Sequence, residues 1–288
     1  MPHVESNGLQ LAYESYGDPA DPPLVLVMGL GTQLLGWPAE FCQLIADRGF
    51  RVVRFDNRDV GLSTHLNDLP MPDLAAILGG DRSTVPYLMS DFADDVAGLF
   101  DALGFAKAHV VGASMGGMIA QQFVIDHPDR VLSLCSIMST TGDPNVGQGT
   151  PATLALLTRP PATSRDEAIE QGLVGLQLLS SPAYPATDDE QRAKAAAAYD
   201  RAFNPAGALR QTAAIIGSPD RTAGLRSVTV PTLVIHGTDD PLVNISGGEA
   251  TVAAVPGATW LAVPGMGHDL PPGAWPVVVD AIVANTKA

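Results

Sequence analysis

Short apolar runs alternate with longer stretches of helical periodicity along most of this chain. Six apolar runs have the length and composition of strands, at 24–28, 51–55, 109–111, 131–138, 232–236 and 259–263. Helical stretches lie between them at about 37–48, 90–103, 115–127, 246–255 and 273–286. This alternation predicts βαβ units and an α/β fold around a parallel sheet that is buried on both faces. The run 9–16 alternates in polarity, as an antiparallel edge strand would.

The alternation stops between residues 141 and 227. This segment opens with Gly, Asp, Pro and Asn, and continues with Ala- and Leu-rich helical stretches separated by Pro-rich breaks such as RPPATS and FNPAG. A separate helical domain is one interpretation. We favour an insertion, because strand-like runs resume directly after it. The sequence therefore predicts an α/β core formed by residues 1–140 and 228–288, with a helical insertion at 141–227.

The composition indicates a folded chain without a membrane span. Of the 288 residues, 46% are apolar and 16% are charged, which excludes disorder as the main state. No uninterrupted apolar run reaches the roughly 18 residues that a spanning helix needs, and the start, MPHVESNGLQ, lacks the apolar core of a secretory signal. Two cysteines are too few for a disulfide scaffold or a four-cysteine zinc site. We therefore expect a cytoplasmic protein without a metal.

Acidic side chains dominate the charge. The chain has 31 Asp and Glu residues against 16 Lys and Arg residues, and its formal net charge is −15. Nucleic acid and anionic membrane surfaces repel such a protein. We expect a small-molecule substrate, no nucleic-acid partner and no integral membrane association, and either a monomer or a homodimer.

The strongest candidate for chemistry lies at 109–120, in the sequence HVVGASMGGMIA. A G-x-S-x-G pattern between a strand and a helix is typical of a nucleophile elbow, in which a tight turn exposes the serine hydroxyl. Side chains at Gly112 and Gly116, two residues to either side of the serine, would collide in that turn. Ser114 is therefore the predicted nucleophile. A glycine-rich turn with a capping serine is the alternative.

A serine hydroxyl needs a base at neutral pH, and two histidines late in the chain are candidates. In proteins with this elbow, an Asp or Glu and then a His follow the serine along the chain. His268 lies in VPGMGHDLP, a glycine-rich loop between the last strand and the last helix. Such a loop brings a side chain over the carboxyl edge of the sheet, so we predict His268 as the base. His236, which ends a strand, is the alternative, although a structural role fits it better.

The remaining groups are an acid that orients the histidine and two donors for an oxyanion. The acid is expected at a strand end between nucleophile and base, where VIHGTDDPLVN offers Asp239 and Asp240; we favour Asp240. Acyl transfer also requires backbone donors for a tetrahedral oxyanion. We predict the N–H of Met115, directly after the nucleophile, and the N–H of Leu30, in the glycine-rich loop VMGLGTQLLGW. A tight turn without a catalytic role is the alternative for that loop.

Together these segments resemble the α/β-hydrolase superfamily over nearly the whole chain. The resemblance rests on VMGLG…LGW at 27–37, RFDNRDVGLS at 54–63, VGASMGGMIAQ at 111–121, VIHGTDDPLV at 234–243 and PGMGHDLP at 264–271. Within the superfamily, the chain is similar to the esterase branch that includes aclacinomycin methylesterase and bacterial lipase-type hydrolases.

This resemblance implies a set of site residues. They are the triad Ser114, Asp240 and His268 and the oxyanion donors Leu30 and Met115. The resemblance also identifies 141–227 as a helical cap over the active site and implies no metal or organic cofactor. Met28 stands where many relatives carry His before the loop glycine. Asp56 and Arg58, in RFDNRDVGLS, are expected to fix loops by ion pairing.

The predicted function is the hydrolysis of small apolar esters through an acyl-enzyme on Ser114. An Ala- and Leu-rich cap favours apolar acyl groups. The resemblance implies methyl or other short-alkyl esters as substrates, and lipid-like esters are the alternative. Two other functions stay open. The same triad could catalyse carbon–carbon bond hydrolysis or perhydrolysis, or the scaffold could bind a ligand as a receptor without turnover. The complete set of Ser, His and Asp candidates favours the enzyme.

Overall fold

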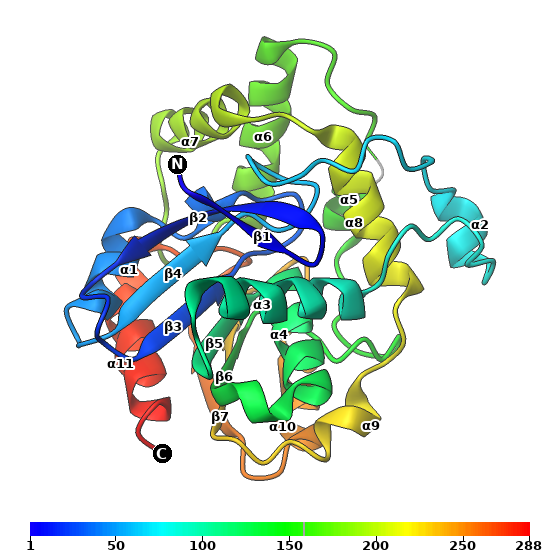
Figure 1. Cartoon of the computed structure of the whole chain (residues 1–288). Coiled ribbons are helices and arrows are strands. Elements are labelled where there is room, and N and C mark those ends of the chain that lie inside the picture. Colours follow the sequence, from blue (N-terminus) through cyan, green and yellow to red (C-terminus); the bar gives the residue numbers. More distant parts are fainter. Residues whose placement is uncertain (158) are drawn as a thin grey trace.

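The computed structural model describes residues 1–157 and 159–288. Within them, eight strands form one sheet in the order β1-β2-β4-β3-β5-β6-β7-β8 (Figure 1). The strands are β1 (His3–Ser6), β2 (Leu9–Tyr16), β3 (Pro23–Val27), β4 (Arg51–Phe55), β5 (Ala108–Ala113), β6 (Val131–Ile137), β7 (Thr232–Gly237) and β8 (Thr259–Val263). β1 and β4 both pair antiparallel with β2, whereas the pairs from β4 to β8 are parallel. This mostly parallel sheet confirms the predicted α/β fold class.

The N-terminal edge of the sheet differs from the prediction. β2 is antiparallel, as its alternating pattern indicated, but it lies between β1 and β4, and β1 is the edge strand. The two strands form a tight hairpin through Asn7 and Gly8, which both have positive φ angles of 50° and 76°. An Asn-Gly pair is a strong local signal for such a turn. The prediction that 9–16 forms an edge strand was wrong because this signal was overlooked.

Helices cover both faces of the sheet, and the central strands β3, β4, β5 and β6 supply side chains to both layers. The helices of the two layers are α1 (Ala39–Ala46) and α11 (Trp275–Asn285) on one face, and α3 (Met89–Leu103), α4 (Met115–Asp126) and α10 (Ser246–Ala254) on the other. All six residues of β5 are buried, and Val110 and Val111 point into opposite layers. A continuous apolar run is therefore required here, because neither face of β5 meets solvent.

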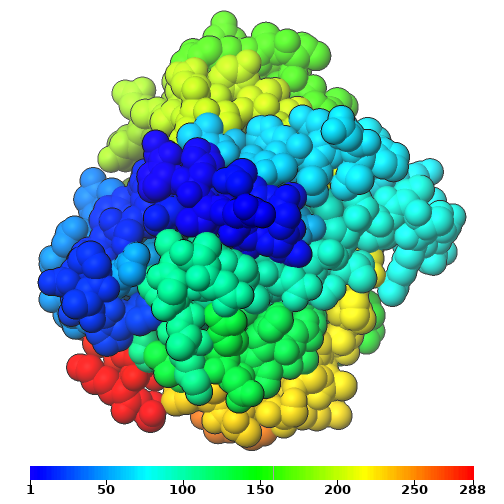
Figure 2. Space-filling model, viewed as in Figure 1, coloured from blue at the N-terminus to red at the C-terminus, as the bar shows by residue number. Residues whose placement is uncertain are grey.

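Most of the remaining helices lie between β6 and β7. They are α5 (Pro151–Leu157), α6 (Arg165–Leu179), α7 (Asp188–Arg201), α8 (Pro205–Gly217) and α9 (Thr222–Leu225). α6 and α7 pack together at one end of the molecule, far from α11 (Figure 1), and the space-filling view shows these two helices gathered there (Figure 2). α9 instead packs on α4 and α10, so it belongs to the helical layer that covers that face of the sheet.

Short elements complete the chain. They are α2 (Leu74–Leu78) and the 3-10 turns η1 (Leu34–Gly36), η2 (Pro128–Arg130) and η3 (Pro272–Ala274). α2 packs against α8 and protrudes from the side of the molecule (Figures 1 and 2). Among the helices that the structure describes, none is long and apolar enough to cross a membrane.

Candidate active site

Ser114 occupies a strained turn between β5 and α4. Its φ and ψ angles are 57° and −122°, a region that non-glycine residues rarely adopt. A Cβ atom on Gly112 would lie 2.1 Å from the carbonyl oxygen of Gly116, and one on Gly116 would lie 2.1 Å from that of Val27. Neither position can hold a side chain, so both glycines of the G-x-S-x-G pattern are required by the backbone path itself.

The structure brings Ser114, His268 and Asp240 into one hydrogen-bonded chain. The Nε2 atom of His268 lies 2.9 Å from the Oγ atom of Ser114, and its Nδ1 atom lies 2.8 Å from the Oδ2 atom of Asp240. The three residues follow β5, β8 and β7, so they meet at the carboxyl edge of the parallel strands. Parallel topology is what allows side chains from such distant positions to converge.

Asp240 is held as a carboxylate by its surroundings. Burial by itself raises the pKa of this carboxyl, but the positive charge available at His268 and hydrogen bonds from the protein outweigh that effect and lower the pKa below its usual value. The backbone N–H groups of Leu242 and Val243 donate to Oδ1 over 2.9 Å and 2.8 Å. Oδ1 is thereby fixed by the backbone, and Oδ2 is left for the imidazole.

The two alternative residues from the sequence lie outside this chain of contacts. Asp239 is exposed, and its carboxylate accepts from the hydroxyl of Thr238, its chain neighbour. His236 is fully buried, and its Nε2 atom lies 2.8 Å from the carbonyl oxygen of Val243. Because a carbonyl can only accept, this Nε2 atom carries the proton. The same atom lies 3.4 Å from Oδ2 of Asp240, so His236 contacts the acid rather than the serine.

The predicted oxyanion donors flank the serine. A Cβ atom on Gly29 would lie 3.0 Å from Ser114 Cβ and 3.4 Å from its Oγ, so the loop that contains Leu30 passes directly beside the Ser114 side chain. Met115 is the first residue of α4. The N–H groups of a first helical turn have no partner within the helix, and the helix dipole favours negative charge at that end.

Two polar side chains that the sequence did not single out hold this loop. The Nδ2 atom of Asn57 donates to the carbonyl oxygen of Met28 over 2.8 Å. The N–H of Gly31 donates to Oε1 of Gln211, on α8, over 2.8 Å. Asn57 lies within the RFDNRDVGLS motif, whereas no motif marks Gln211.

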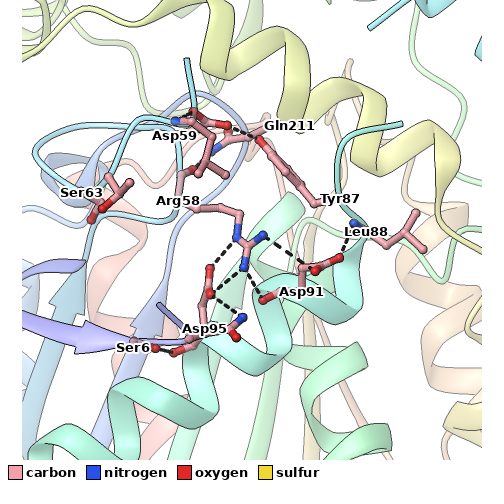
Figure 3. Close-up of polar contacts among 12 residues, drawn as sticks. Ser6, Arg58, Asp59, Ser63, Tyr87, Leu88, Asp91, Asp95 and Gln211 are labelled. Atoms are coloured by element: carbon pink, nitrogen blue, oxygen red, sulfur yellow. Dashed lines mark hydrogen bonds and ion pairs between the residues drawn. The ribbon is translucent and has the colours of Figure 1, made fainter. Parts of the chain in front are cut away.

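The neighbours of Asn57 form the ion pairs that were expected of them. Asp56 pairs with Arg201 over 2.7 Å, and Arg58 pairs with Asp95 over 2.6 Å. Figure 3 shows the Arg58 guanidinium directed toward Asp91 and Asp95 on α3. These contacts join the segment after β4 to α3 and α7. Asn57 in that segment contacts the loop at 27–37, which we call the oxyanion loop after its predicted role.

The His268 loop is held from the helical segment. The N–H of His268 donates to the carbonyl oxygen of Leu179 over 2.8 Å, and the N–H of Gly267 donates to the hydroxyl of Ser181 over 2.8 Å. That hydroxyl donates in turn to the carboxyl of Asp269. Burial raises the pKa of Asp269 despite this hydrogen bond. Backbone and side-chain contacts of this kind have no local sequence signal.

Other titratable candidates do not join the site. Cys42 and Cys135 are buried, and burial raises the pKa of the Cys42 thiol to about 12. His127, which also follows Ser114 in the chain, pairs with Asp94 over 3.0 Å. Among residues 1–157 and 159–288, no group of three or more His, Cys, Asp or Glu side chains is placed to hold a metal ion.

Comparison with known proteins now assigns the fold. Residues 22–271 match the family described as the alpha/beta hydrolase fold. The chain belongs to the α/β hydrolase fold family. It is 29% identical to rhodomycin D methylesterase DauP of Streptomyces sp. (strain C5), over 99% of this chain and 97% of that protein. A putative carbamate hydrolase, RutD of Caulobacter sp. (strain K31), is 27% identical over 96% of this chain and 94% of its own.

Solved structures agree on the architecture. The meta-cleavage product hydrolase CumD of Pseudomonas fluorescens IP01 superposes with a TM-score of 0.77, over 100% of this chain and 97% of its own, at 18% identity. At that identity the likeness shows the fold alone. The predicted family, its esterase branch and the enzyme class, an esterase-type hydrolase, are thus confirmed. The cytoplasmic location and the monomeric or homodimeric state stay predictions.

Proposed function

We propose that this protein is a serine ester hydrolase in which Ser114 is the nucleophile, His268 the base and Asp240 the residue that orients the base. One observation carries the proposal: an uninterrupted hydrogen-bonded chain runs from the Ser114 hydroxyl through the imidazole to a buried carboxylate. A receptor has no need for this arrangement, since binding alone requires neither a strained serine nor an oriented imidazole.

The reaction starts when the Ser114 oxygen attacks the ester carbonyl while Nε2 of His268 takes the hydroxyl proton. A bond forms between Oγ and the carbonyl carbon, and the carbonyl electron pair becomes an oxyanion facing the N–H groups of Leu30 and Met115. The tetrahedral species then breaks its bond to the leaving alcohol, which takes the proton from His268. Water, deprotonated by the same imidazole, attacks the acyl-enzyme and releases the acid and the free serine.

The substrates that we propose are methyl or other short-alkyl esters of bulky apolar acids. The full-length similarity to a rhodomycin D methylesterase supports this class. We also propose that residues 141–227 act as a cap over the site. The contacts of Leu179 and Ser181 with the His268 loop, and of Gln211 with the oxyanion loop, support that role.

The test is a panel of methyl and p-nitrophenyl esters of increasing acyl size, with product analysis by mass spectrometry. Ser114→Ala should lower ester turnover by a factor on the order of 10⁶ and leave the melting temperature within a few degrees of the parent, because the hydroxyl contributes little to packing. Turnover that persists in this variant would remove Ser114 from the mechanism. Products of carbon–carbon cleavage or of perhydrolysis in place of acid and alcohol would replace the esterase reaction with one of those two.

A further inference from the structure

Gln211 lies on α8, outside the sheet, and its side chain connects two loops of the sheet core. Its side chain is fully buried in α8. Oε1 accepts from the N–H of Gly31 over 2.8 Å, and Nε2 donates to the carbonyl oxygen of Arg58 over 2.7 Å. The first partner can only donate and the second can only accept, so the two contacts define one orientation of the amide.

Arg58, whose carbonyl oxygen accepts from Gln211, is itself held in place through its side chain. The guanidinium of Arg58 forms two hydrogen bonds with the Asp95 carboxylate, at 2.6 Å and 2.7 Å, and donates to the carbonyl oxygen of Asp91 over 3.0 Å. Figure 3 shows these contacts on the α3 side of the loop and Gln211 on the opposite side. Gln211 therefore holds Gly31 against a segment that is fixed on α3.

Three successive peptide groups of the oxyanion loop are each held by a hydrogen bond. Asn57 binds the carbonyl of Met28. The carbonyl of Gly29 accepts from the N–H of Thr32 over 3.3 Å. Gln211 binds the N–H of the third peptide group, the one between Leu30 and Gly31, and the Thr32 hydroxyl donates to its carbonyl over 3.1 Å.

The middle peptide group carries the Leu30 N–H. In a planar trans peptide the C=O and N–H point in opposite directions, so the direction of the Leu30 N–H follows from the plane in which Gly29 C=O lies. The hydrogen bonds that fix the Met28–Gly29 and Leu30–Gly31 peptide groups limit the orientation of this middle plane. Gly31 has a φ of +62°, and glycine adopts positive and negative φ angles about equally well. The local backbone therefore does not fix the Leu30–Gly31 peptide group by itself. The N–H contact with Gln211 therefore supplies a constraint that Gly31 lacks by itself.

We propose that Gln211 is a positioning residue for the reaction: by holding the Leu30–Gly31 peptide group, it directs the Leu30 N–H toward the developing oxyanion. The inference rests on the proposed esterase function and adds a residue of α8 to the active-site frame. It predicts that the bridge contributes to kcat more than to substrate affinity, because the oxyanion exists only after attack.

The decisive variant is Gln211→Met, which keeps the length of the side chain and removes both hydrogen bonds. Complete loss of one oxyanion donor costs about 10²- to 10³-fold in kcat, and misdirection of one costs less. We expect kcat to fall by about 10- to 100-fold with KM changed by less than about 3-fold. The affinity for a trifluoromethyl ketone, which forms a tetrahedral adduct with the serine, should fall by about the same factor as kcat/KM.

Thr212→Val is the matched control, because Thr212 lies next to Gln211 on α8. Within the part of the chain that the structure describes, its hydroxyl bonds only to the carbonyl oxygen of Ala208 in that helix. The control should keep the kcat of the parent. A kcat for Gln211→Met within twofold of the parent, a loss confined to KM, or an equal loss in Thr212→Val would each overturn the proposal.

Gln211→Glu keeps the proposal testable if Gln211→Met does not fold. A carboxylate still accepts from Gly31 N–H but repels the Arg58 carbonyl, whereas a protonated carboxyl restores the donor. The ratio of variant to parent kcat should therefore rise as the pH falls from 8 to 5; a constant ratio contradicts the bridge. Ser114→Ala, assayed in parallel, separates the two proposals. Activity in that variant rejects the esterase mechanism, whereas an inactive Ser114→Ala beside a fully active Gln211→Met rejects only the role of Gln211.

Discussion

Asp240 and Asp239 are chain neighbours of the same chemistry, and the structure separates them by their partners. The backbone turn after β7 points two N–H groups at Oδ1 of Asp240, and the imidazole of His268 meets Oδ2. Asp239 faces solvent, and its carboxylate accepts a hydrogen bond from its chain neighbour Thr238. A carboxylate that is fixed in this way selects one tautomer of the histidine and stabilises its charged form.

This difference gives a matched pair of variants. Asp240→Asn should lower kcat by about 10²- to 10⁴-fold, because the amide cannot stabilise the imidazolium and favours the wrong tautomer. Asp239→Asn should change kcat by less than about 2-fold. Steady-state kinetics on one ester at pH 7 to 8 measures both. If Asp239→Asn has the larger effect, the orienting acid has been assigned to the wrong residue.

At the residue scale, the sequence predicted what a motif marks and missed what only three-dimensional contact creates. The G-x-S-x-G pattern located Ser114 because the turn itself demands the glycines. Asp239 and Asp240 could be ranked but not separated, since both stand at the same strand end. Gln211 could not be found, because its two partners lie 180 and 153 residues away along the chain.

At the element scale, α8 is joined to the sheet core by a buried ion pair. Arg210, which is 1% exposed, contacts both carboxylate oxygens of Asp59, which is fully buried, over 2.8 Å and 2.7 Å. The hydroxyl of Tyr87 donates to the same carboxylate over 2.7 Å. Burial raises the pKa of Asp59, but these hydrogen bonds, one from Leu66 N–H and the charge of Arg210 outweigh it, so the pKa lies below its usual value.

The pair makes a prediction about stability. Asp59→Asn leaves the buried Arg210 without its counter-charge and should lower the free energy of unfolding at pH 7 by about 3 kcal/mol. Urea unfolding measures this change. Because the pKa of Asp59 is lower in the folded than in the unfolded protein, its stabilising effect is present above the unfolded value of about 3.9 and is lost as the pH falls through the folded value.

The difference between parent and Asp59→Asn should therefore shrink as the pH is lowered from 5 toward 3. A difference that stays constant over this range would mean that the charge of Asp59 does not stabilise the fold. Arg210→Met gives the complementary case: it leaves a buried carboxylate unpaired, so its destabilisation should become smaller once that carboxylate is protonated at low pH.

At the scale of the whole molecule, the alternation of short apolar and longer helical runs predicted the layered sheet, because both periodicities are local. The β1–β2 hairpin was missed, although the Asn7-Gly8 pair is a local signal for its turn. The segment 141–227 was harder to interpret. It is rich in Ala and Leu, but it also contains eight of the 16 Lys and Arg residues of the chain.

Several of those cations form ion pairs between elements. Arg201 and Arg210 pair with the buried carboxylates of Asp56 and Asp59 in the loop after β4. Together with the contacts of Leu179 with His268 and of Gln211 with Gly31, they tie the helical segment to both loops that flank the serine. The proposed site is therefore assembled from parts of the chain that no single motif connects.

The most direct measurement of the central claim is covalent labelling of the nucleophile. The protein is treated with diisopropyl fluorophosphate, digested and mapped by mass spectrometry, with Ser114→Ala as the control. We expect one peptide, containing Ser114, to carry a diisopropylphosphoryl group, formed as the serine oxygen displaces fluoride. Its formation should parallel the loss of esterase activity, and the variant should carry no label. Esterase activity that survives without a label on Ser114, or is lost with a label on another residue, would contradict the claim.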